Sequence, residues 1–168
     1  MAHPLVMALF AQPAAAAAAG RELRTAGIPG ERISFVARSH DEEGDLAEAS
    51  GGTPGSEIED SRAAGRLGEL GAHFLAAVAV VLPGVGPILA DGPFAAELGE
   101  AAGHIAGGLS RTLQQAGLPD ATAEAWERRI EEGDVLVAVH TDQGRVAAVR
   151  ELLERFGGVD VTTGMWSN

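Results

Sequence analysis

The chain has 168 residues, which is long enough for one domain with a buried core. Its 24 acidic and 12 basic side chains give a net charge of -12, and Lys is absent. Nucleic acids and anionic membranes are bound by concentrated basic faces, so nucleic acid is not expected as a partner and peripheral membrane contact is disfavoured. The absence of Cys excludes disulfides, thiolate catalysis and thiolate metal sites.

The N-terminal third is expected to form a first βαβ unit, over residues 1–38. Residues 5–10 are an apolar run bounded by prolines, which predicts a buried strand. Residues 14–26 are strong helix formers that end before Gly27, and residues 33–37 predict a second strand. No basic segment precedes the first apolar run, as a secretory signal would require, so we expect a cytoplasmic protein.

The middle of the chain predicts a loop followed by a helical hairpin. Residues 39–60 are rich in Asp, Glu, Gly and Ser, which predicts a flexible acidic loop. Ser61 can cap a helix from residue 62 to about residue 81, and a second helix is expected from about residue 91. Small residues on both predicted helices would allow close packing. Residues 61–117 are therefore expected to form a glycine/alanine-rich antiparallel helical hairpin.

The last third, residues 118–168, predicts a helix followed by a second βαβ unit. Strands are expected at 134–140 and 159–162, on either side of a helix at 144–156. Trp126 is expected in the core, and Trp166 either in the core or on a partner. The whole order predicts a single α+β domain with a ferredoxin-like βαβ…βαβ frame, in which both units share one sheet.

Several segments resemble the bacterial general stress protein 17M-like family. They are the terminal strands and helices at residues 6–10, 23–28, 33–37 and 131–137, and the segments 82–93 and 117–119, of which 82–93 reads Leu-Pro-Gly-Val-Gly-Pro-Ile-Leu-Ala-Asp-Gly-Pro. The resemblance covers almost the whole chain. It implies a stress-associated protein, and it supplies no catalytic residues.

A Glu-x-x-x-His pattern occurs twice in the predicted hairpin, as Glu69 with His73 and as Glu100 with His104. Residues four apart share a helix face, so antiparallel helices turning near Pro87 would bring two imidazoles and two carboxylates to one level. These are ligands for a divalent metal such as zinc. Alternatively, each pair is a helix-surface contact that stabilises the helix by a few tenths of a kcal/mol.

The sequence contains no motif that indicates nucleotide binding or a serine hydrolase. No Gly-rich phosphate-binding pattern follows a strand, and no Ser lies in a Gly-x-Ser-x-Gly sequence. The leading hypothesis is a non-enzymatic, stress-associated structural or interaction protein that self-associates as a homo-oligomer through its hairpin. The alternative is a metal-binding or oxidoreductase-like protein that uses the four Glu and His residues.

Overall fold

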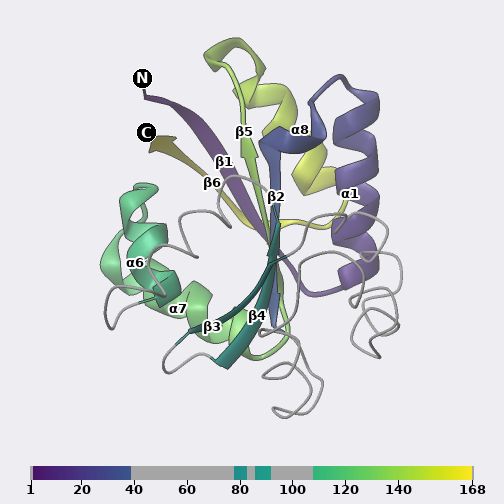
Figure 1. The fold of residues 1–168 in the computed structure, drawn as a ribbon. Helices are drawn as coiled ribbons and strands as arrows, with labels where there is room; N and C mark the ends of the chain where they lie inside the picture. Colours follow the sequence, from purple (N-terminus) through teal and green to yellow (C-terminus); the bar gives the residue numbers. More distant parts are fainter. Residues whose placement is uncertain (1, 39–77, 83–85, 92–107, 168) are drawn as a thin grey trace.

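The computed structural model describes residues 2–38, 78–82, 86–91 and 108–167, and these form three layers (Figure 1). A six-stranded sheet lies in the middle. Helices α1 and α8 cover one face, and helices α6 and α7 lie on the other. The first strand begins beside the end of the last strand, so the two ends of the chain are neighbours.

The first βαβ unit consists of β1 (His3–Phe10), α1 (Pro13–Thr25), a short 3-10 helix η1 (Gly30–Arg32) and β2 (Ile33–Arg38). Pro13 begins α1, where its fixed φ suits the first helical turn and its missing N–H leaves no bond unmade. Gly27 follows the helix with φ of +84°, and the next amide donates to the Leu23 carbonyl. This left-handed glycine cap turns the chain back towards the sheet.

The C-terminal part begins with two helices, α6 (Gly108–Gln115) and α7 (Asp120–Glu131). The second βαβ unit follows, with β5 (Val135–His140), a 3-10 turn η2 (Gln143–Arg145), α8 (Val146–Arg155) and β6 (Val159–Trp166). These elements confirm the helices and strands predicted for residues 118–168. Strand β6 continues four residues beyond the predicted end at residue 162, because it pairs with β1 up to Trp166 opposite His3.

The two βαβ units interleave in one sheet, which confirms that they share it. The strand order is β3-β4-β2-β5-β1-β6, and every neighbouring pair is antiparallel. Strand β5 therefore lies between β1 and β2, and β1 lies between β5 and β6. Each unit contributes two parallel strands that are separated by one strand of the other unit.

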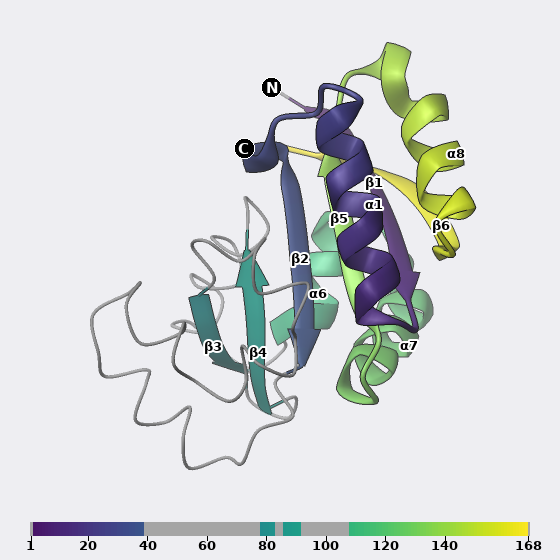
Figure 2. The same ribbon diagram turned by 90° about the vertical axis from the view of Figure 1, so that its right-hand side faces the viewer.

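Part of the expected helical hairpin is a pair of strands instead. Residues 78–82 form β3 (Val78–Leu82) and residues 86–91 form β4 (Gly86–Asp91), so the prediction of a helix continuing to residue 81 is wrong there. The physical reason is pairing: β4 lies along the outer edge of β2, and β3 lies along β4 (Figure 2). The β-branched residues in the Val-Ala-Val-Val-Leu run favour this strand.

Each sheet face has its own apolar core. Side chains from β1 alternate between them, with Leu5 and Met7 on the face of α6 and α7 and with Val6 and Ala8 on the face of α1 and α8. Strand β5 is buried along its whole length because it is central and covered on both sides. Burying each large aliphatic or aromatic side chain stabilises the fold by about 1.5–3 kcal/mol. Trp126 of α7 is 2% exposed, as predicted for a core residue.

Gly164 brings β6 into close contact with the segment after α6. A Cβ atom added at Gly164 would clash with the carbonyl oxygen of Ala116, and it would lie 3.0 Å from the carbonyl carbon of the same residue. Only a residue without a side chain allows this approach, so Gly164 sets the distance between β6 and the α6–α7 connection.

Among the described residues, no helix has the length and apolar character needed to cross a membrane.

Candidate functional site

The four residues of the predicted metal site, Glu69, His73, Glu100 and His104, lie outside the described residues, as does the acidic loop 39–60. One premise of that hypothesis is wrong, because Pro87 lies within β4, opposite Val81, and not in a turn between helices. Over residues 2–38, 78–82, 86–91 and 108–167, no group of three or more His, Asp or Glu side chains could hold a metal ion.

Two histidines and a tryptophan meet at one end of the sheet. His3 begins β1, His140 ends β5 and Trp166 ends β6. The His3 Nε2 and His140 Nδ1 atoms are 2.7 Å apart and share a hydrogen bond. The Trp166 ring meets the His140 ring edge to face, with centroids 5.4 Å apart and planes at 86°. The three side chains thus tie the ends of β5, β1 and β6 together.

His140 is held in its neutral form. It is 4% exposed, and its pKa is lowered from 6.5 to about 4, first by burial and then by the nearby charges of His3 and Arg32. Its Nε2 atom has no hydrogen-bond partner among the described residues. The cluster therefore contains a neutral imidazole that gains a proton only at acid pH, and that proton would enter a site with little access to water.

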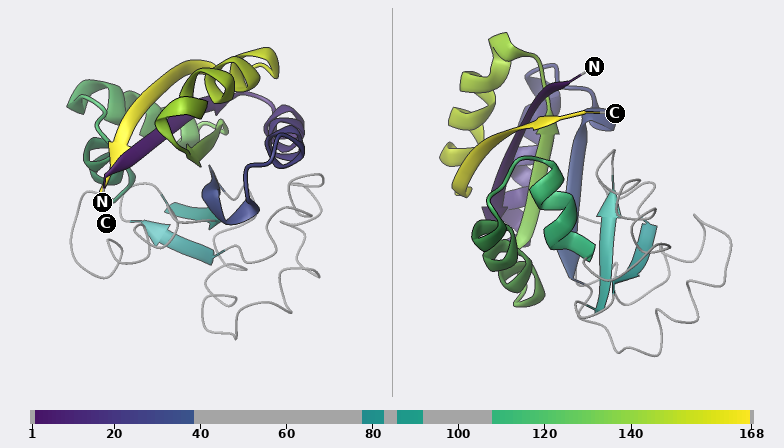
Figure 3. Two further views of the ribbon diagram at one scale, coloured as in Figure 1. Left: turned by 90° about the horizontal axis from the view of Figure 1, so that it is seen from above. Right: turned by 90° about the vertical axis from the view of Figure 1, so that its left-hand side faces the viewer.

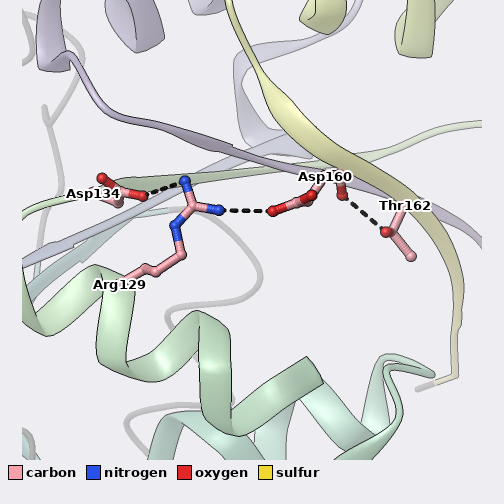
Figure 4. Close-up of polar contacts among 4 residues, drawn as sticks. All are labelled: Arg129, Asp134, Asp160 and Thr162. Carbon is pink, nitrogen blue, oxygen red and sulfur yellow. Dashed lines mark hydrogen bonds and ion pairs between the residues drawn. The ribbon is translucent and has the colours of Figure 1, made fainter. Parts of the chain in front are cut away.

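Arg129 forms a second polar cluster, which connects α7 to Asp134, the residue before β5, and to β6 (Figure 4). Its guanidinium lies 2.7 Å from Asp134 Oδ2 and 2.7 Å from Asp160 Oδ2. Asp160 has φ of 53°, and its carbonyl accepts a hydrogen bond from the Thr162 hydroxyl at 2.9 Å. The cluster thus stabilises an unusual backbone conformation at the start of β6.

The start of β6 is irregular at this point. The β1–β6 register shifts between Met7 and Leu9, so that two residues of β6, Asp160 and Val161, lie where β1 has only Ala8. This is a β-bulge, a feature that disrupts strand pairing and is common at sheet edges. Beyond it, residues 162–166 pair regularly with residues 3–7 of β1.

Strand β6 is an outer strand of the described sheet, next to β1 (Figure 3). One face of its regular part carries exposed side chains, at Thr163 and Met165. Residues 161–166 read Val-Thr-Thr-Gly-Met-Trp and contain no charged residue and no proline. Met165 is 50% exposed and Val159 is 43% exposed. Natural edge strands are usually protected by charges, prolines or bulges, and this one has its bulge and charge only at the beginning.

Helix α8 lies beside this edge and places two charges there. Arg150 Nη1 donates a hydrogen bond to the Thr163 hydroxyl at 3.2 Å. Glu154, one turn later, lies 3.8 Å from the Arg150 guanidinium. The face of β6 that carries Thr163 and Met165 is thus bordered by a positive and a negative group.

Comparisons with protein-family models, with curated proteins and with solved structures found no match to this chain.

Neither the histidine cluster nor the exposed edge of β6 was predicted from the sequence. His3 and His140 are 137 positions apart, and neither lies in a pattern that indicates a site, so only the register of β1 with β5 brings them together. The exposed edge of β6, in contrast, could have been predicted from the composition of residues 161–166. An uncharged run of β-branched and aromatic residues after the bulge position is the composition of a strand that can accept another strand.

Proposed function

We propose that this protein is a non-enzymatic, stress-associated interaction protein that binds its partners by strand pairing at β6. The observation that carries the proposal is the regular, uncharged outer edge at residues 162–166, which among the described strands pairs with β1 alone. An exposed edge of this kind binds an additional strand through main-chain hydrogen bonds, and side chains at alternate positions supply specificity.

The association with stress rests on the resemblance to the general stress protein 17M-like family in residues 6–10, 33–37, 82–93 and 131–137. We infer a ferredoxin-like frame for the same protein. The order β2-β5-β1-β6 and the two interleaved βαβ units support this frame. A fold of this type hosts many activities, so the function depends on the edge and not on the frame.

Position-specific photo-crosslinking in cells tests the proposal. A photoreactive amino acid replaces Met165, whose side chain is half exposed on the β6 edge. Ala121, exposed in the first turn of α7 and remote from β6 in sequence, is the matched control position. We expect crosslinked products from position 165, in larger amounts after heat or cold stress, and few from position 121.

Equal crosslinking from the two positions would contradict the strand-pairing proposal, because the contact would then have no preference for β6. Crosslinking from position 165 that does not change with stress would leave strand pairing in place and remove the association with stress.

A further inference from the structure

We propose that the strand paired with β6 belongs to a second copy of this chain, so that two sheets join about a two-fold axis near Thr163. This inference rests on the proposed strand-pairing function and names its partner. Antiparallel pairing of two identical strands is the isologous contact that a two-fold dimer requires.

The residues on one face of β6 complement themselves in this register. Val161, Thr163 and Met165 share the face of α1 and α8, since Thr163 lies opposite Val6 and Met165 opposite Pro4, and Val161 packs on the core of that face. An axis at Thr163 pairs this threonine with its own copy. It also sets Val161 opposite Met165 of the second copy, twice. Cross-strand Thr–Thr and apolar pairs of this kind stabilise a sheet.

The pairing also covers surface that a single copy leaves in water. Thr163 is exposed and Met165 is half exposed, although both belong to a regular strand. On the opposite face, Gly164 and Trp166 are already buried by the chain's own residues. Within residues 163–166, the exposed side chains therefore lie on the face that carries Thr163 and Met165, next to the edge that the second strand would contact.

The charges beside the edge are compatible with a second copy. Arg150 and Glu154 lie 3.8 Å apart on α8, and Arg150 is hydrogen-bonded to Thr163. A two-fold axis reverses their order in the second copy, so that an arginine of one α8 can approach a glutamate of the other. Within residues 161–166 no like charges would be brought together, because the segment has none.

The mass of this 168-residue chain in solution, measured by light scattering at micromolar concentration, tests the dimer. We expect twice the chain mass of 17.2 kDa for the wild type. Met165→Glu should shift the mass to that of a monomer, because it places a carboxylate on each side of the axis. Ala121→Glu adds the same charge on α7 and should remain dimeric. Circular dichroism of each variant verifies that it is folded.

A cysteine crosslink tests the register independently of any loss of folding. The chain has no native Cys, so Thr163→Cys introduces a single thiol. A disulfide requires Cα atoms within about 7 Å, which an axis at residue 163 provides. We expect a disulfide-linked dimer of Thr163→Cys under mild oxidation, and far less from Ala121→Cys.

A monomeric wild type would overturn the inference. So would a dimer that Met165→Glu does not dissociate and that Thr163→Cys does not link by a disulfide. These outcomes are distinct from failure of the proposed function. A monomer that still crosslinks to other proteins from position 165 would remove the second copy as partner and leave strand pairing intact.

Discussion

At the level of single residues, His140 couples the stability of the protein to pH. The imidazole is neutral in the folded state because burial, aided by His3 and Arg32, lowers its pKa to about 4. In the unfolded chain the pKa returns to about 6.5. Between these values the unfolded state binds more protons than the folded state, so acid favours unfolding. The contribution is complete above pH 6.5 and is lost as the pH falls towards 4.

We therefore expect the free energy of unfolding to decrease between about pH 6.5 and pH 4, with a share from His140 on the order of 3 kcal/mol. His140→Phe retains an aromatic ring against Trp166 and cannot titrate. The free energy of unfolding of this variant should therefore decrease less over the same pH range, by the contribution of His140. His3→Gln is the matched control. It removes the electrostatic contribution of His3 to the lowered pKa of His140, and we expect it to retain the contribution of burial, which is the largest cause. Urea unfolding at a series of pH values measures these differences, and superimposable profiles for wild type and His140→Phe would contradict the assignment.

At the level of elements, the contact between β6 and the α6–α7 connection depends on Gly164. A side chain at this position meets the backbone carbonyl of Ala116 and not a flexible side chain that could move aside. The strand or the connection must then shift, and the neighbouring apolar contacts of Met7 would be strained as well.

We expect Gly164→Ala to reduce the free energy of unfolding by about 1–3 kcal/mol, the range found for overpacked positions. Gly144→Ala is the matched control, because a Cβ atom there meets nothing within 4 Å. Chemical denaturation of the two variants gives the comparison. A loss of stability that is equal in both would indicate a general effect of replacing glycine and not the close approach of β6.

The terminal elements could be predicted from the sequence because their signals are local. Apolar runs of strand length alternate with helices that end at Gly27, Gly133 and Gly157, and all three glycines have positive φ. The segment 78–91 could not be assigned in this way. The alanines on either side favour a helix, and the strand forms because the edge of β2 offers a partner, which is a tertiary effect.

At the level of the whole molecule, charge opposes assembly while the β6 edge favours it. Each copy carries a net charge of -12, so a dimer brings together two strongly negative molecules. The edge itself contains no charge at residues 161–166. The repulsion is consequently long-range and sensitive to dissolved salt, whereas the strand pairing is short-range and is not.

We expect the dimer dissociation constant to decrease several-fold as ionic strength rises from about 0.01 M to about 0.15 M, over which the Debye length falls from about 30 Å to about 8 Å. Ala121→Glu should steepen this dependence, because it changes the net charge of each copy from -12 to -13 and adds no charge to residues 161–166. Sedimentation at several salt concentrations measures it. A dimer that weakens with added salt would show that charge pairs between the copies outweigh the net repulsion.

The interleaved sheet has a consequence for how the protein is made. Strand β1 leaves the ribosome well before its two neighbours, β5 and β6, which come more than 120 residues later in the sequence. Its buried residues, such as Leu5 opposite His140, have no sheet partner until then. Pairings between such distant segments slow folding and prolong the exposure of apolar strands. The nascent chain therefore carries an unpaired hydrophobic strand until β5 and β6 have been synthesised, and a chaperone has the greatest opportunity to bind it during that interval.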